Sequence, residues 1–292
     1  MHAQTAPSAE DYLKSAIGHV RSKEPDKALT DLDQAVKLNP RLAEAFLLRA
    51  SVRDQKGDKE GALSDYNTAI DLMPAGPGIE AAYNNRSLIR LIKGDGVGAL
   101  TDINMAIKLN PVVPAFYNQR AIIKLQSGDA DGAVADYEKA LALSPKLPSA
   151  YYGRGAYRFQ KGDFDGAISD FSRAIELKQD YSSAYVSRGL AHGLKGDIDP
   201  AIEDLKKGLA LNPGAVSDQG KGNFTTPVKD LSRFILSHPT NARAYEFRGI
   251  LRLIQSKETE AKQDFSKSLE LDSQLKSEID RVAEAIRTPK VR

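Results

Sequence analysis

The 292-residue sequence contains no cysteine and no tryptophan, and its net charge at neutral pH is only +2. Without cysteine the chain has no disulfide bond, no cysteine-ligated zinc or iron–sulfur cluster and no thiol nucleophile. No apolar run approaches the ~18 residues that span a bilayer. The small net charge gives no indication of nucleic-acid or membrane binding, so nucleic acid is not an expected partner. What remains is ample apolar material, 41% of all residues, for a packed core.

The sequence does contain a repeat of about 34 residues, which places similar residues at the same positions of seven units. The fourth position of every unit is aromatic: Tyr12, Phe46, Tyr83, Tyr117, Tyr151, Tyr185 and Tyr245. The twentieth position is always alanine: Ala28, Ala62, Ala99, Ala133, Ala167, Ala201 and Ala261. Each unit has two stretches of helical apolar periodicity, and Gly-Asp dipeptides such as Gly57-Asp58 separate them in five units. Glycine can end the first helix in the left-handed conformation, and aspartate can cap the second.

This pattern resembles the tetratricopeptide-repeat family over roughly residues 9–273. The resemblance implies an all-α fold, a right-handed superhelical solenoid of about seven helical hairpins whose concave side is lined by the first helices. One hairpin cannot bury its own apolar face, so the units are expected to stack.

The expected organisation divides the chain at the irregular segments. A flexible leader (1–8) precedes six repeat units (9–213), and a degenerate unit of one loop and one helix follows (214–239). The final unit (240–273) and a capping helix with a tail (274–292) complete the chain. The leader resembles the remnant of a cleaved bacterial secretory signal, which would place the protein in the periplasm, but a native cytoplasmic start fits equally well.

Two columns of charged residues repeat along the units. The seventh position is arginine in six units, for example Arg154, and the twenty-third is always aspartate, for example Asp170. In an antiparallel hairpin these positions lie opposite each other, so we predict one structural ion pair per hairpin. The first unit differs, because Ser15 leaves Asp31 without its arginine.

A third column, at the eleventh position, is basic or carries histidine. Its members include Arg53, Arg90, Lys124, Arg158 and Arg252, with His19 and His192 in the other two units. One interpretation is structural, with the long stems covering neighbouring helices and the charged groups meeting nearby acids. The other is a positively charged ribbon that attracts an anionic partner.

The family resemblance also implies which residues line the concave groove of the central units. They are Asn84, Asn85, Asn118, Gln119, Ile122, Gln126, Tyr152, Phe159 and Gln160. Amides can donate to and accept from an extended peptide backbone, and aromatic residues can receive apolar side chains. Asn85 falls where related peptide-binding superhelices use an asparagine ladder, although Gln119 and Gly153 do not continue it.

We therefore predict a noncatalytic scaffold that binds a peptide or a helix of another protein in its groove. The alternative is a structural or self-associating spacer in a larger complex, with no peptide ligand. The four histidines are far apart in the sequence, so no metal site, cofactor or acid–base constellation is expected.

Overall fold

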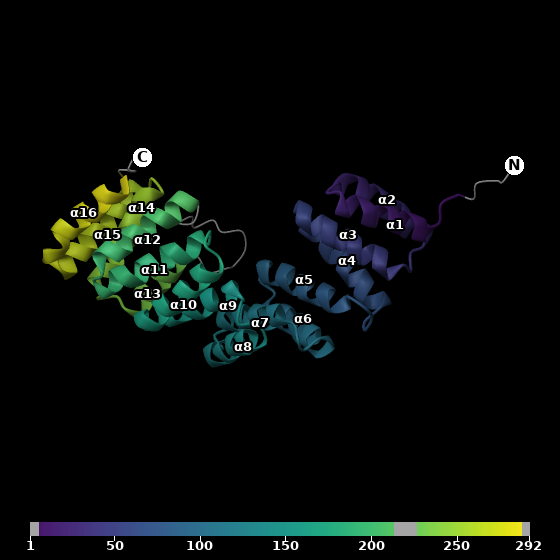
Figure 1. Cartoon of the computed structure of the whole chain (residues 1–292), viewed down its shortest axis with the longest axis horizontal. Helices are drawn as coiled ribbons and strands as arrows, with labels where there is room; N and C mark the ends of the chain where they lie inside the picture. The colour runs from purple at the N-terminus through teal and green to yellow at the C-terminus, as the bar shows by residue number, and fades with distance from the viewer. Residues whose placement is uncertain (1–5, 213–226, 288–292) are drawn as a thin grey trace. The chain divides into compact units, whose positions relative to one another are not determined.

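The computed structural model describes residues 6–212 and 227–287, and all regular structure in these ranges is helical (Figure 1). The prediction of an all-α repeat fold is therefore confirmed. Three predicted segments lie wholly or partly outside the described residues. They are the first five residues of the expected leader, the loop at 214–226 and the final residues 288–292.

Seven helical hairpins follow the predicted repeat. Their first helices are α1 (Ala9–Arg21), α3 (Ala43–Lys56), α5 (Ile79–Ile92), α7 (Pro114–Gln126), α9 (Pro148–Gln160), α11 (Ser182–Lys195) and α14 (Ala242–Ile254). Their second helices are α2 (Pro25–Leu38), α4 (Lys59–Leu72), α6 (Gly96–Leu109), α8 (Ala130–Leu143), α10 (Phe164–Leu177), α12 (Ile198–Leu211) and α15 (Glu258–Leu271). Three elements stand outside this alternation: α13 (Pro227–Ser237), the short 3-10 helix η2 (Ser273–Leu275) and α16 (Lys276–Arg287).

The turns inside the hairpins have the predicted chemistry. The five glycines of the Gly-Asp dipeptides have φ angles from +78° to +95°: Gly57, Gly94, Gly128, Gly162 and Gly196. In four of these turns the following aspartate caps the second helix, as when Asp163 accepts a hydrogen bond from the Gly166 N–H at 2.9 Å. The exception is Asp197, because the residue three positions later is Pro200, which has no N–H to donate.

This exception gives a matched pair of variants. We expect Asp163→Ala to lower the free energy of unfolding by about 1 kcal/mol, because it removes a side-chain cap. Asp197→Ala has a smaller effect, since Asp197 makes no cap bond and lies only near His192 and Lys195. Chemical denaturation of both variants checks this order, and equal losses would contradict it.

The internal contacts divide the chain into two compact units, with the boundary inside α8 between Ala133 and Val134. In unit 1, which ends at Ala133, α1 contacts α3 and α5 contacts α7, so the first helices form a layer. The fourth-position aromatics Tyr83 and Tyr117 are buried in it, at 7% and 8% exposed. We call the side of this layer turned away from the second helices the first-helix face.

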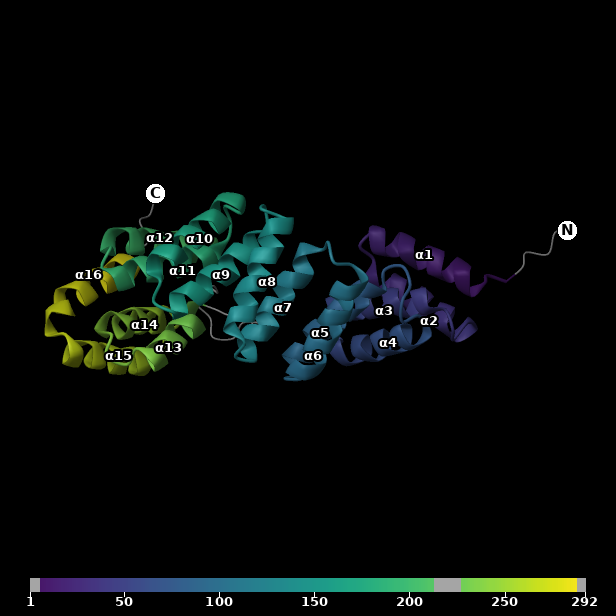
Figure 2. The ribbon, with the colours of Figure 1, turned by 90° about the horizontal axis from the view of Figure 1, so that it is seen from below.

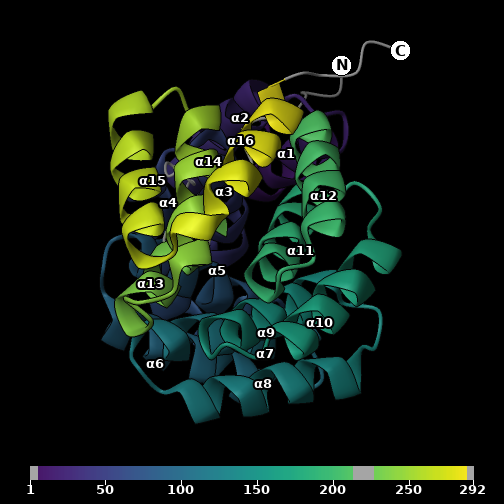
Figure 3. The same cartoon turned by 90° about the vertical axis from the view of Figure 1, so that its left-hand side faces the viewer.

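Unit 2, from Val134 onward, departs from simple stacking. Helix α13 lies against α9, α11 and α14, and Figure 2 shows it beside α14. Helix α16, predicted as a capping helix, has its main contacts with α12 and with α14 of the last hairpin (Figure 3). Its apolar residues Ile279 and Val282 are buried, and Val282 belongs to the same core cluster as Leu231 and Phe234 of α13.

Candidate functional site

The predicted arginine–aspartate pairs form within the hairpins. In five of them the arginine Nε and Nη2 donate to both oxygens of one carboxylate, at 2.7–3.0 Å. The pairs are Arg49–Asp65, Arg86–Asp102, Arg154–Asp170, Arg188–Asp204 and Arg248–Asp264. All five aspartates are at most 6% exposed, and the bond to Asp170 raises the pKa of Arg154. The prediction of a structural ion pair is confirmed for these hairpins.

Each of these arginines also lies over the fourth-position aromatic ring of its own helix. The guanidinium carbon of Arg154 is 5.8 Å from the ring centroid of Tyr151, and Arg86 is 5.5 Å from that of Tyr83. The ring and the carboxylate together fix the guanidinium plane. The aromatic and arginine columns are separated by three residues in each of these units, and this constant spacing on a helix could have predicted the stacking from the sequence.

The basic eleventh position reaches the same carboxylates. The Nη1 atoms of Arg53, Arg90, Arg158 and Arg252 donate to the second oxygen of the aspartate at 2.7–2.9 Å. Lys124 donates to the Gly132 carbonyl at 3.2 Å. Two arginines therefore share one buried aspartate. This aspartate neutralises much of the positive charge that, in the ribbon hypothesis, attracts an anionic ligand. Binding of an anionic partner along this column stays a prediction.

The amides predicted for the groove of unit 1 lie on the first helices α5 and α7, and two of them are already bonded within the chain. Asn84 Nδ2 donates to Asn85 Oδ1, and Asn85 Nδ2 donates to the Tyr66 hydroxyl of α4, both at 3.1 Å. The Tyr66 ring is buried, which raises the pKa of its hydroxyl to about 12 and keeps it neutral as an acceptor. Asn85 is thus held in place by the preceding hairpin.

The equivalent amides of α7 are different. Among the described residues, Asn118 Oδ1 and Gln119 Nε2 are buried and have no hydrogen-bond partner, and Gln119 is only 9% exposed. The repeat explains the contrast, because the residue of α6 equivalent to Tyr66 is Ile103, which offers no hydroxyl. Ile122, one helical turn further, is half-buried against the core of unit 1, and Gln126 is exposed at the end of α7.

In unit 2 the predicted groove residues are not open to a ligand in this conformation. Phe159 is 2% exposed and packs on Phe164 and Phe234, with each pair of ring centroids 5.7 Å apart. Tyr152 is 8% exposed and packs on Phe171 and Tyr181. The expectation that these two aromatics receive ligand side chains needs correction, because core residues and α13 already cover them.

Gln160, the third predicted residue of unit 2, donates from Nε2 to Asp230 Oδ1 of α13 at 3.0 Å. Asp230 is 3% exposed, its other oxygen has no partner among the described residues, and Arg233 lies 3.8 Å away. Burial raises the pKa of Asp230 to about 7. On α14, Glu246 is fully buried, and burial with the nearby Glu278 charge raises its pKa to about 8. Sequence patterns gave no sign of either buried acid.

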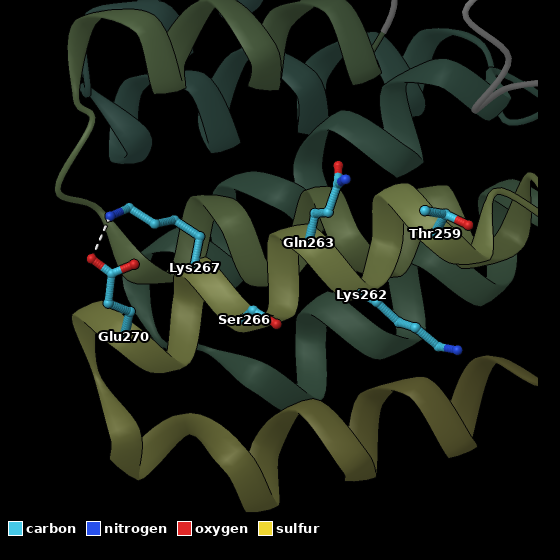
Figure 4. Close-up of a pocket in the computed structure, with 6 residues that line it drawn as sticks. All are labelled: Thr259, Lys262, Gln263, Ser266, Lys267 and Glu270. Atoms are coloured by element: carbon cyan, nitrogen blue, oxygen red, sulfur yellow. Dashed lines mark hydrogen bonds and ion pairs between the residues drawn. The ribbon is translucent and has the colours of Figure 1, made fainter.

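A shallow polar hollow of unit 2 lies on α15 (Figure 4). It is lined by Thr259, Lys262, Gln263, Ser266, Lys267 and Glu270. Lys267 is paired with Glu270 at 2.6 Å, and all six side chains come from one helix. Its lining residues are all polar or charged, so it does not form a binding site comparable to α5 and α7.

Comparisons with known proteins agree with this architecture. The sequence profile of the tetratricopeptide repeat matches residues 13–78, 118–182 and 152–216, which together make up more than half of the chain. A tetratricopeptide-repeat protein from Parabacteroides merdae is similar in structure, with a TM-score of 0.62 and 19% identity over 97% of this chain and 100% of that one. The PilF protein of Pseudomonas aeruginosa is similar with a TM-score of 0.60 and 17% identity over 70% of this chain and 92% of that one. No curated protein matches the chain in sequence.

The chain therefore belongs to the tetratricopeptide-repeat family. Proteins of this family are generally noncatalytic scaffolds that bind other proteins, and the fold is that of a protein-interaction scaffold. None of the helices that the structure describes has both the length and the apolar composition of a membrane span. Likewise, no three acidic or histidine side chains gather as metal ligands within residues 6–212 and 227–287.

Proposed function

We propose that this protein is a scaffold that binds an extended peptide segment of a partner protein on the first-helix face of unit 1, at α5 and α7. The observation that carries this proposal is the pair of buried, unpartnered amide atoms Asn118 Oδ1 and Gln119 Nε2. A buried polar atom without a partner costs about 1–3 kcal/mol, so the two side chains recover that free energy when they turn outward to a ligand that satisfies them.

The two atoms have complementary roles. Asn118 Oδ1 accepts a hydrogen bond and Gln119 Nε2 donates one, and a peptide backbone offers both an N–H and a C=O at regular intervals. The bonded pair Asn84 and Asn85 occupies the same repeat positions on α5. The half-buried Leu88 and Ile122 supply apolar surface beside these amides for the side chains of the peptide.

Peptide selection tests the proposal. Short random peptides displayed on phage are selected against the full chain, and the best is synthesised with a fluorescent label for anisotropy titration. We expect Gln119→Ala to weaken its binding about tenfold, the equivalent of one lost hydrogen bond. Asn85→Ala should have a smaller direct effect, because Asn85 is engaged by Tyr66.

Gln179→Ala is the matched control, because Gln179 is an exposed amide in a turn of unit 2. Its binding should equal that of the wild type. Unchanged binding by Gln119→Ala contradicts the proposal. Light scattering provides the second check: a concentration-dependent dimer that selects no peptide favours the alternative of a self-associating spacer.

A further inference from the structure

Helix α13 packs on the first helices of unit 2, a surface that we call the first-helix face of that unit. It contacts α9 and α11, the first helices of two successive hairpins, as well as α14. Four of its apolar side chains, Val228, Leu231, Phe234 and Ile235, are each at most 5% exposed. These spacings place all four on one face of a helix.

The contacts of α13 resemble those of a helical ligand in a binding groove. Phe234 is the anchor, since its ring lies 5.7 Å from that of Phe159 in α9 and 5.4 Å from that of Phe164. The hydrogen bond from Gln160 to Asp230 fixes the position of the helix along α9. The opposite side of α13 is open to solvent, with Leu236 at 84% exposed and Arg233 about half exposed.

Unlike α9, α11 and α14, helix α13 is not half of a hairpin. The first helices α9, α11 and α14 are each tied to a second helix through a short turn and an arginine–aspartate pair. α13 carries no such pair among its described contacts, and its one buried carboxylate is only partly satisfied. Its departure would therefore leave every hairpin intact.

We propose that the first-helix face of α9 and α11 is a second binding site, one that accepts an amphipathic helix of a partner protein, and that α13 is its built-in occupant. The partner helix carries an aromatic residue in the place of Phe234, with aliphatic residues three before it and one after it. It also carries a hydrogen-bond acceptor opposite Gln160. This inference concerns a different face from the peptide site of unit 1 and does not depend on it.

Occupancy by α13 sets the affinity that a partner experiences. When a site is open in only a fraction of molecules, the apparent affinity falls by that fraction. Substitutions that weaken the packing of α13 in its own chain should therefore strengthen the binding of a separate helical peptide. This effect separates an occupant from a helix that only completes the core.

The probe is a fluorescent synthetic peptide with the sequence of residues 227–238, titrated against the full chain. We expect the double variant Leu231→Ala/Phe234→Ala to bind the peptide at least tenfold more tightly than the wild type does, because its own α13 competes less. A peptide with its own Phe234→Ala change is the matched control and should bind neither protein. A folded double variant that does not bind the wild-type peptide overturns the proposal.

Hydrogen exchange of the wild-type chain decides the matter if the double variant fails to fold. The proposal requires the amides of α13 to exchange at least tenfold faster than those of α9 and α11, since α13 opens by itself. Exchange of all three helices in one cooperative step shows that α13 is an integral part of the core, and the proposal is then wrong.

Discussion

The variant Asp230→Asn should be more stable than the wild type at pH 8 and nearly equal to it at pH 4. Asp230 is buried, with a pKa raised from 3.8 to about 7 in the folded chain. Below about pH 4 the carboxyl is protonated in both the folded and the unfolded states, so it costs nothing. Between about pH 4 and pH 7 the unfolded state is ionised while the buried carboxyl stays protonated, so the stability falls as the pH rises, and the loss is complete above pH 7, where both states are ionised. Each unit of pKa difference is worth about 1.4 kcal/mol, so we expect a gain of about 2–4 kcal/mol for asparagine at pH 8.

Asparagine suits this position because its carbonyl oxygen can still accept the bond from Gln160. Urea denaturation of unit 2 at several pH values measures the effect. The control is Asp165→Asn, since the Asp165 side chain is 83% exposed and pairs with Lys195 on the surface. The control should show no comparable pH-dependent gain. If Asp230→Asn is instead less stable than the wild type at pH 8, Asp230 is ionised and needed as a charge in the fold.

Removal of the shared aspartate should be the most damaging change to a hairpin. In the α9–α10 hairpin, Asp170 accepts from both Arg154 and Arg158, and its side chain is 4% exposed. Asp170→Ala leaves two partly buried guanidinium groups without their carboxylate, and we expect a loss of about 3–5 kcal/mol. Arg154→Ala should cost less, about 1–3 kcal/mol, because Arg158 still neutralises Asp170. Arg158→Ala should cost least, since the bidentate pair remains.

Thermal and urea unfolding of the three variants check this order. Arg173→Ala is the control, because Arg173 forms an exposed surface pair with Glu176, and such pairs contribute little. The account also expects Arg154→Ala to leave the affinity for a selected peptide unchanged. An unaltered melting temperature for Asp170→Ala would contradict the structural role of the shared carboxylate.

The sequence predicts the hairpins well because their determinants are local. The aromatic, alanine, glycine and aspartate positions each act within one repeat, and the same physical solution recurs along the chain. Even the exception at Asp197 could be predicted, since Pro200 lies three residues further along the printed sequence. The arginine–aspartate pairing followed from the symmetry of an antiparallel hairpin.

The predicted site was less complete, because it depends on packing between elements distant in sequence. Tyr152 and Phe159 were placed in an open groove by their repeat positions, but α13, some 70 residues later, covers Phe159. The same helix carries Asp230 into contact with Gln160, and no periodicity indicates such a contact. Conversely, Asn118 and Gln119 were predicted as groove residues, but only the structure distinguishes them from the bonded Asn84 and Asn85.

We expect the amides of α5 and α7 in unit 1 to engage a peptide ligand, while the first-helix face of unit 2 is occupied by α13. Hydrogen exchange of the full chain, with and without a saturating selected peptide, tests it most directly. We predict slower exchange in α5 and α7 and no change in α9 and α11. Protection confined to the second helices, or to unit 2 alone, would contradict the account.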